Sequence, residues 1–354
     1  MVYDPTKPYN DLPLLSPEVS IESGAVLKKT ISASRALSEL KGAITNLPNP
    51  TLFIDTINLQ EAQASSEIEN IITSQDELFR AASMDKKINN PAAKEVLHYK
   101  DAMWHGVSKI KLKPVLSTNL FIELVQIIKE NKAGIRNLPG TQLTNPATKK
   151  IIYTPPEGED KIRELLHNLE EFIHSENGLD PLVKMAVIHY QFEAIHPFFD
   201  GNGRTGRIIL VLYLIHSGLL DLPCLYLSKY IIANKSKYYK NMRRVTENNE
   251  WEPWLLYMLD MIETTAKNGR ERIRQIEKLM VKTGNEIQKE LSKVYSKDLL
   301  EILFRLPYTK RQFLHNAGLG TLKTVGNYLK DLENAGFLVS EQIGKEKLYL
   351  NTRL

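Results

Sequence analysis

Two apolar segments on either side of a short polar stretch constrain this chain most. Residues 181–195 repeat apolar side chains at helical spacing and begin with Pro181, which suits the first turn of a helix. Residues 208–215 are apolar nearly all round, which is typical of a helix buried in a core. The pattern predicts two buried helices, so the polar stretch between them needs a chemical reason.

The stretch from His196 to Arg207 reads His-Pro-Phe-Phe-Asp-Gly-Asn-Gly-Arg-Thr-Gly-Arg. Its glycines remove side chains, so backbone N–H groups can approach an anion closely. The stretch leads into the N-terminus of the next helix, where unpaired N–H groups and the helix dipole favour negative charge. Arg204 and Arg207 lie one turn apart and can hold neighbouring phosphates. These features predict a phosphate site; the alternative is a helix–helix turn with incidental arginines.

Two more side chains extend this prediction. Asp200 precedes the glycines and is placed to hold a Mg²⁺ that bridges phosphate oxygens, while His196 titrates near neutrality. The whole string resembles the signature of the Fic family, His-Pro-Phe-x-x-Gly-Asn-Gly-Arg-x-x-Arg, at every fixed position. The resemblance implies a helical nucleotidyl transferase that moves AMP from ATP to a protein hydroxyl.

The resemblance also implies a role for each residue. His196 would accept the proton of a target Tyr, Thr or Ser hydroxyl as that hydroxyl attacks the α-phosphorus of ATP. Asp200 would hold Mg²⁺ on the α and β phosphates, while the Phe198 ring would pack inward and anchor the stretch. Arg204 would hold the β-phosphate and Arg207 the γ-phosphate. The implied ATP-binding set is Gly201, Asn202, Gly203, Arg204, Thr205, Gly206, Arg207, Asn234 and Tyr239.

A second motif lies upstream of the first. Taken alone, Glu67 and Glu69 are solvated carboxylates on a helix. Ser65, Glu69 and Asn70, however, are similar to the inhibitory motif of Fic proteins, Ser/Thr-x-x-x-Glu-Gly/Asn, in the subgroup whose inhibitory helix precedes the Fic core. The resemblance implies that Glu69 forms a forked, charge-assisted pair with Arg207. This pair would occupy the guanidinium that the γ-phosphate needs, so ATP would bind unproductively.

Residues 140–156 are rich in β-formers around an Asn-Pro turn, which predicts a hairpin; the alternative is a plain connecting loop. In Fic proteins this position is the flap, whose exposed edge pairs with the main chain of the target. The resemblance implies that Ile151, Ile152 and Tyr153 form the working strand of the flap.

We expect a mainly α chain with four parts: an N-terminal helical region (1–110), a Fic core (111–266), a helical connector (267–295) and a winged-helix-like domain (296–354). Three helices and a hairpin in the last part resemble a winged helix-turn-helix. Lys323, Asn327 and Lys330 would face a DNA major groove, but Asp331 and Glu333 share their helix. Such domains also mediate protein contacts or homodimers, so DNA binding is the less favoured use.

Composition narrows the class of protein further. Lys+Arg 46 against Asp+Glu 42 gives a net charge of +4, too mild to argue for nucleic acid. The single cysteine, Cys224, excludes an internal disulfide and a cysteine-based zinc site, and we expect it to be a buried apolar residue. The apolar runs are too short to cross a membrane, and the N-terminus lacks the apolar region of a signal peptide. We therefore expect a cytoplasmic protein with ATP and Mg²⁺ at hand.

Two rival functions stay open at this point. Doc-type relatives transfer the γ-phosphate, but their motif replaces the glycine–arginine pattern that Gly203 and Arg207 keep here. The chain could instead be a DNA-binding regulator whose Fic domain senses ATP. The sequence does not name the target, nor does it say whether Glu69 also positions water to remove AMP.

Overall fold

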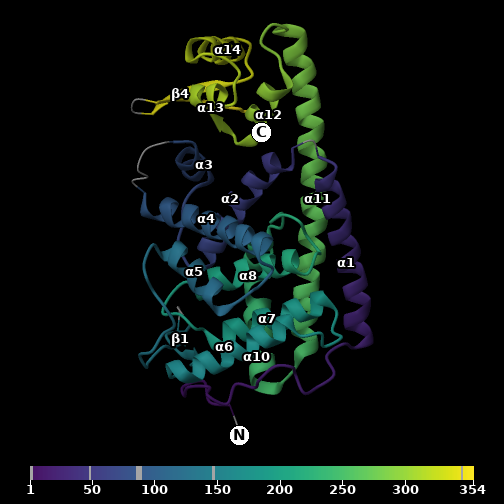
Figure 1. Cartoon of the computed structure of the whole chain (residues 1–354), viewed down its shortest axis with the longest axis vertical. Coiled ribbons are helices and arrows are strands. Elements are labelled where there is room, and N and C mark those ends of the chain that lie inside the picture. The colour runs from purple at the N-terminus through teal and green to yellow at the C-terminus, as the bar shows by residue number, and fades with distance from the viewer. Residues whose placement is uncertain (1–2, 48, 85–89, 146–147, 344–345) are drawn as a thin grey trace.

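The computed structural model describes residues 3–47, 49–84, 90–145, 148–343 and 346–354, and it is mainly helical, as predicted (Figure 1). Its helices are α1 (Gly24–Thr45), α2 (Pro50–Ile68), α3 (Gln75–Ser83), α4 (Pro91–Leu112), α5 (Thr118–Lys129), α6 (Glu159–His174), α7 (Pro181–Ile195), α8 (Asn202–His216), α9 (Leu227–Ala233), α10 (Lys235–Asn248), α11 (Trp251–Glu290), α12 (Lys297–Arg305), α13 (Arg311–Asn316) and α14 (Leu322–Asn334). Its strands are β1 (Leu143–Thr144), β2 (Ile151–Tyr153), β3 (Tyr308–Thr309), β4 (Val339–Ile343) and β5 (Glu346–Leu350). They form an antiparallel pair, β1–β2, and an antiparallel sheet in the order β3–β5–β4.

Helices α7 and α8 lie at the centre of the larger core, as their apolar sequences predict. α7 begins at Pro181 behind the N-cap Asp180, whose carboxylate accepts a hydrogen bond from the Leu182 N–H at 2.8 Å. From Leu182 to Ile195, all but one side chain of α7 is buried. Trp254 of α11 donates its indole N–H to the Ala186 carbonyl at 2.9 Å, which fixes α7 against the long helix.

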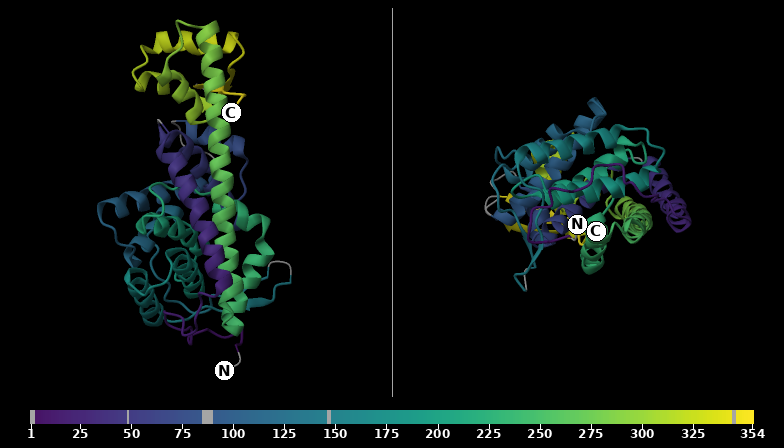
Figure 2. Two further views of the ribbon diagram at one scale, coloured as in Figure 1. Left: turned by 90° about the vertical axis from the view of Figure 1, so that its right-hand side faces the viewer. Right: turned by 90° about the horizontal axis from the view of Figure 1, so that it is seen from below.

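Helix α1 runs beside the first part of the longer helix α11, which extends on to the C-terminal end of the molecule (Figure 2). Their side-chain contacts keep one offset: Lys29 pairs with Asp260, and the Ser32 hydroxyl donates to Glu263 at 2.7 Å. Glu39 and Arg270 pair at the same offset further along. A constant offset over ten residues means that the two helices are parallel. α11 is continuous from the Fic core into residues predicted to form a separate connector.

Residues 297–354, which we call the C-terminal module, form most of a second hydrophobic core, to which Ile287 and Val294 also contribute. Helices α12, α13 and α14 and the β4–β5 hairpin lie where the sequence predicts three helices and a hairpin. Strand β3 was not predicted; it pairs Tyr308 with Leu350 at the edge of β5. Figure 1 shows the module at the upper end of α11, above α2 and α3. The winged-helix assignment itself stays a prediction.

Helix α6 was missed by the sequence analysis. Its buried residues Ile162, Leu165, Leu166 and Leu169 have helical spacing, so the signal was present. Residues 227–248 form two helices, because the chain bends at Asn234 between α9 and α10. Ser65 lies inside α2, which ends at Ile68.

Candidate active site

The predicted phosphate stretch joins α7 to α8, and α8 begins earlier than expected. The connection covers only residues 196–201, because Asn202 is already the first residue of α8. The Asn202 side chain closes the connection, since it donates to the Phe198 carbonyl (2.7 Å) and accepts from the Phe198 N–H (2.8 Å). The Phe198 ring is fully buried, as predicted. The first N–H groups of α8 therefore lie at the glycine-rich turn, where an anion would meet them.

The first two glycines have different structural reasons. Gly201 is the N-cap of α8 at φ 84°, a left-handed conformation that glycine adopts without strain. Gly203 provides space instead: a Cβ there would lie 2.3 Å from Glu69 Oε1 and 2.9 Å from an Arg207 nitrogen. The backbone at Gly203 thus borders the place where Glu69 meets Arg207.

Gly206 lies inside α8 and faces α7. A Cβ at this position would lie 2.2 Å from Oε1 of Glu193, so the glycine makes room for this carboxylate. Burial, with a smaller contribution from Glu69, raises the pKa of Glu193 to about 7, although the nearby Arg207 charge opposes the rise. Thr205 beside it is fully buried. Both residues were predicted to bind ATP, and the structure places them on the packed side of the helix.

His196 ends α7 in a left-handed conformation with φ 49°. Arg136, whose side chain is buried, holds this turn from outside: its Nε donates to the His196 carbonyl (2.8 Å), and its terminal nitrogen contacts the Ile195 and Pro156 carbonyls. Burial and the Arg136 charge lower the pKa of His196 to about 4, against smaller opposing contributions from Glu69 and Asp200. The imidazole is therefore neutral at physiological pH and can accept a proton.

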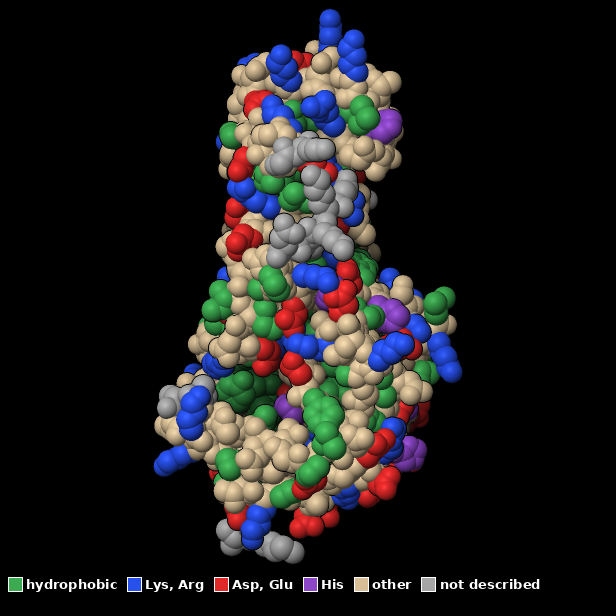
Figure 3. Space-filling model, turned by 90° about the vertical axis from the view of Figure 1, so that its left-hand side faces the viewer, with side chains coloured by type: hydrophobic (Ala, Val, Ile, Leu, Met, Phe, Trp, Pro, Cys, Tyr) green, Lys and Arg blue, Asp and Glu red, His purple; other side chains and the backbone are tan. Residues whose placement is uncertain are grey.

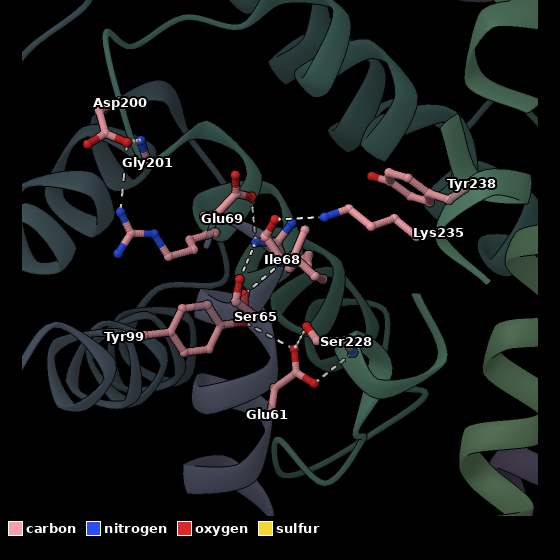
Figure 4. Close-up of polar contacts among 12 residues, drawn as sticks. Glu61, Ser65, Ile68, Glu69, Tyr99, Asp200, Gly201, Ser228, Lys235 and Tyr238 are labelled. Carbon is pink, nitrogen blue, oxygen red and sulfur yellow. Dashed lines mark hydrogen bonds and ion pairs between the residues drawn. The ribbon is translucent and has the colours of Figure 1, made fainter. Parts of the chain in front are cut away.

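Arg207 is buried in α8 and reaches the end of α2, where Figure 4 shows its partners Ser65 and Glu69. Its Nε donates to the Ser65 hydroxyl (2.8 Å), and one terminal nitrogen donates to the Ser65 carbonyl (2.8 Å) and to Glu69 Oε1 (2.9 Å). The predicted contact between Arg207 and Glu69 is present. The predicted fork differs, because Glu69 receives one nitrogen of the guanidinium while Ser65 receives two. The Glu69 side chain stays 38% exposed and the Arg207 side chain only 2%.

The backbone conformation at the position after Glu69 explains why an asparagine, Asn70, stands there. Glu69 is the C-cap of α2, and Asn70 has φ 65°, in the left-handed region. Glycine and asparagine enter this region most easily, so the helix can stop here and turn its last carboxylate toward Arg207. On the opposite side, Lys235 Nζ donates to the Ile68 carbonyl at 3.0 Å and steadies the same helix end.

Arg204 meets a different set of charges. It is buried in α8, and Nη1 donates to Glu95 of α4 at 2.6 Å. Lys129 of α5 contacts the same Glu95 oxygen at 2.8 Å and Asp200 at 2.6 Å. Burial would raise the pKa of Asp200, but Lys129 and Arg204 outweigh this and lower it. The four groups form a charge cluster around the start of α8.

Asp200 is the predicted Mg²⁺ ligand, and its surroundings can be tested for fit. No group of three or more His, Cys, Asp or Glu side chains suited to a metal occurs among the described residues. Mg²⁺ commonly takes one or two carboxylates and completes its shell with substrate phosphates and water. Asp200 offers such a carboxylate, 64% exposed, next to the helix start. The donor set therefore suits an ion that arrives with a nucleotide, provided that Lys129 gives way.

Beneath Ser65, a buried carboxylate joins three helices (Figure 4). Glu61 of α2 accepts hydrogen bonds from the Ser228 N–H of α9 (2.9 Å), from the Ser228 hydroxyl and from the Tyr99 hydroxyl of α4 (3.3 Å). Burial raises the pKa of Glu61, although these hydrogen bonds and the Arg207 charge oppose the rise. The network fixes the part of α2 that leads to Ser65.

Asn234 and Tyr239, the predicted nucleoside contacts, lie on the α9–α10 side. The Asn234 amide donates to the Tyr230 carbonyl at 3.0 Å, which closes the end of α9. Tyr239 is 40% exposed, and its ring meets Tyr238 edge-on at 5.1 Å. The Tyr239 side chain is therefore open to solvent, whereas the Asn234 side chain already has a backbone partner.

The predicted flap hairpin is present as β1 and β2. Ile151 and Ile152 are partly exposed on β2, while the Tyr153 hydroxyl donates to the Ala194 carbonyl at 2.7 Å. The N-terminal arm lies beside the end of β2, where the Tyr9 N–H donates to the Thr154 carbonyl at 3.0 Å. The Tyr153 side chain thus anchors this hairpin to α7. Only the backbone of Tyr153 is left to pair with a target.

Several residues of the site were missed by the sequence analysis: Glu61, Glu95, Lys129, Arg136 and Glu193. Glu193 lies on a mostly apolar helix, where a carboxylate signals a required partner; Glu61 shares α2 with several other polar residues, so the sequence gives no such signal for it. Glu95 and Lys129 gave no such signal, because charged residues on amphipathic helices are usually solvated.

Three family domains match the chain in succession. Residues 27–108 match the Fic/DOC family N-terminal domain, residues 115–214 match the Fic/DOC family domain, and residues 279–354 match the C-terminal domain of SoFic-like protein adenylyltransferases. The chain belongs to the Fic family. The second match contains the whole stretch from His196 to Arg207, and the first contains Ser65, Glu69 and Asn70.

Curated relatives carry the same domain. A probable protein adenylyltransferase of Aquifex aeolicus is 28% identical over 186 residues, which cover 51% of this chain and 55% of that protein. The protein adenylyltransferase Fic of Drosophila willistoni is 28% identical over 155 residues, or 42% of this chain and 30% of that protein. The chain thus spans about half or less of the length of these relatives.

Solved structures share the fold. A Fic family protein from Desulfovibrio desulfuricans superimposes with a TM-score of 0.60 at 16% identity, over 96% of this chain and 99% of that one. Fic-1 of Caenorhabditis elegans gives a TM-score of 0.53 at 18% identity, over 71% and 74% of the two chains. In the described part of this chain, no helix combines the length and apolar character that a membrane span requires.

Proposed function

We propose that this Fic protein transfers AMP from ATP to a Tyr, Thr or Ser hydroxyl of a protein target, and that Glu69 restrains the reaction. The observation that carries the proposal is the position of His196, at the end of α7 and directly before the N-terminus of α8, the helix that holds Arg204 and Arg207. A base, an anion site and two guanidinium groups converge there. The names of the relatives support the same activity.

In the proposed reaction the target oxygen bonds to the α-phosphorus, the bond from this phosphorus to the bridging oxygen breaks, and pyrophosphate leaves. His196 takes the proton of the hydroxyl, for which its lowered pKa keeps the imidazole ready. The N–H groups at the start of α8 and the two arginines hold the phosphates in line. Asp200 would hold Mg²⁺, which when bound would neutralise charge on the phosphates.

Restraint by Glu69 follows from the contacts of Arg207. Glu69 and Ser65 occupy the guanidinium of Arg207. In this state a bound ATP would lack the anchor for its γ-phosphate, and its α-phosphate would lie out of line with the attacking hydroxyl. Glu69 is the more exposed partner, so it can withdraw into solvent at lower cost than a buried carboxylate. The flap edge for the target, a Mg²⁺ requirement, homodimer formation and cytoplasmic location stay predictions.

The test is to incubate the full chain with ATP labelled at the α or the γ phosphate and to measure label and mass on protein. AMP transfer predicts label only from the α position. Label only from the γ position would indicate a kinase instead. His196→Ala is the matched control, and we expect it to lower transfer by about 10²–10⁴-fold, the range of general-base catalysis. ATP binding, measured by calorimetry, should stay nearly intact; transfer within about tenfold of the unaltered chain would contradict the role of His196.

A further inference from the structure

The C-terminal module contacts the helix that ends at Glu69. Arg305 of α12 donates through Nε to Asp55 of α2 at 2.9 Å, and its carbonyl accepts from the Thr56 hydroxyl at 3.2 Å. Glu301 accepts from the Asn49 amide at 3.1 Å. α12 also packs directly on α2. The module therefore holds the N-terminal half of the helix whose other end carries the inhibitory motif.

The same module holds α3, which follows the motif. Arg80 of α3 makes a fork with Glu341 of β4, with nitrogen–oxygen distances of 2.8 and 2.7 Å. Its Nε also pairs with Asp76 at 2.7 Å, and the guanidinium lies 5.5 Å from the centre of the Tyr308 ring. The Tyr308 hydroxyl donates to Asp76. Arg80, Asp76, Tyr308 and Glu341 thus form a contact network, which we call the α3 latch.

Between these two attachments, the segment that carries Glu69 is short and tied to α2. The Gln63 side chain donates to the Thr73 carbonyl at 2.6 Å, and the Ile71 N–H donates to the Ser66 carbonyl at 3.0 Å. The motif therefore has the catalytic helix α8 on one side and the C-terminal module on both flanking helices. Figure 1 shows α2 and α3 between the module and the helices of the core.

We infer that the α3 latch positions the inhibitory segment, so that the C-terminal module sets how firmly Glu69 holds Arg207. Arg80 is the central positioning residue, because it alone contacts the other three members of the latch. A shift of the segment from Glu69 to Thr73 would draw the Glu69 carboxylate away from Arg207, and the latch resists this shift through α3. The inference rests on the proposed inhibition and adds its control from a distant part of the chain.

The solvent exposure of the latch side chains determines how large a change in transfer rate we expect. The side chains of Arg80, Asp76 and Glu341 are 29%, 55% and 50% exposed, so water weakens each pair. Figure 3 shows charged side chains of both signs on the face that includes the junction between module and core. For an exposed network, we expect a change in transfer rate of about threefold to tenfold.

The test measures the rate of self-modification with α-labelled ATP in the full chain. Arg80→Glu places a negative charge against Glu341 and should raise the rate about threefold to tenfold. Combining it with Glu341→Arg restores opposite charges across the junction, although the contacts with Asp76 and Tyr308 stay broken, and should lower the rate again toward that of the unaltered chain. Glu286→Gln, which breaks the Glu286–Arg353 pair away from α2 and α3, is the matched control and should leave the rate unchanged.

Each variant is also made together with Glu69→Gly. If the latch acts through Glu69, Arg80→Glu has no effect on the rate of this background. An equal effect in both backgrounds, or an unchanged rate when Glu69→Gly alone activates, would overturn the inference and leave the proposed function standing. Failure of Glu69→Gly itself to activate would overturn the inhibition and the latch together. Melting temperatures of all variants identify any loss that comes from unfolding.

Discussion

Arg204 and Arg207 lie one turn apart on α8, and both are buried, yet their carboxylate partners differ in kind. Arg207 meets Glu69, which follows the last residue of a helix and keeps a side chain 38% exposed. Arg204 meets Glu95, which lies within α4, is 25% exposed and also pairs with Lys129. The partner of Arg207 is placed to leave, and the partner of Arg204 is placed to stay.

A contact between a carboxylate and an arginine can therefore have two different roles in this site. A carboxylate just past the end of a helix can be withdrawn without breaking that helix, so under the proposed inhibition it competes with a phosphate for the guanidinium. A carboxylate within a helix that is shared between two cations keeps a buried guanidinium oriented and gives it its nearest counter-charge. The comparison predicts opposite signs for the removal of Glu69 and of Glu95.

The largest loss among these variants concerns Arg207. Arg207→Ala, made together with Glu69→Gly so that inhibition is absent, should lose about ten- to hundredfold in AMP transfer, since hydrogen bonds to a charged group contribute about 1.5–3 kcal/mol. The γ-phosphate would then have no anchor. Single-turnover transfer with α-labelled ATP measures the loss. A double variant as active as Glu69→Gly alone would show that Arg207 does not bind ATP.

A smaller loss is expected at the other arginine. Glu95→Gln removes the charge that orients Arg204, so transfer should fall about threefold to tenfold, and the melting temperature should fall too, because a buried guanidinium loses its nearest counter-charge. Transfer and thermal unfolding are measured on one preparation. A gain in transfer instead would make Glu95 a second inhibitor and would abolish the difference between the two regions.

The smallest effect is a flat pH profile in the Glu69→Gly variant. The pKa of His196 is lowered to about 4, so the neutral form that accepts a proton persists from high pH down to that value. Protonation of His196 therefore causes no loss of kcat/KM between about pH 6 and 8, whereas an unperturbed histidine near 6.5 would cause one. A decline centred on pH 6.5 would show that His196 is solvated in the working state.

The sequence predicts the two central helices and their motifs better than it predicts the contacts between residues that are distant in the chain. The pair α7–α8 and the contact of Arg207 with Glu69 are present in the structure, as predicted. These features could be predicted because the apolar periodicity of the helices and the two motifs each lie within a short stretch of sequence. The start of α8 at Asn202 was not predicted, because a helical turn rich in glycine cannot be distinguished from a loop by its composition.

Other parts of the site depend on partners that are distant in the chain. Arg204 and Glu95 are separated by 109 residues, and Arg136 and the His196 carbonyl by 60. Nothing near Glu95 in the sequence distinguishes it from a solvated glutamate. The attachment of the C-terminal module to α3 was missed for the same reason, since Arg80 and Glu341 are 261 residues apart.

The central claim is that one carboxylate competes with the γ-phosphate for Arg207, and the rate of self-modification in Glu69→Gly tests it most directly. The full chain and the variant are incubated with α-labelled ATP, with Glu67→Gly as a matched control at an exposed neighbour on the same helix end. Release of a charge-assisted bond of about 1.5–3 kcal/mol predicts a ten- to hundredfold faster rate for Glu69→Gly and no comparable gain for Glu67→Gly. An unchanged rate for Glu69→Gly, with His196 still required, would contradict the claim.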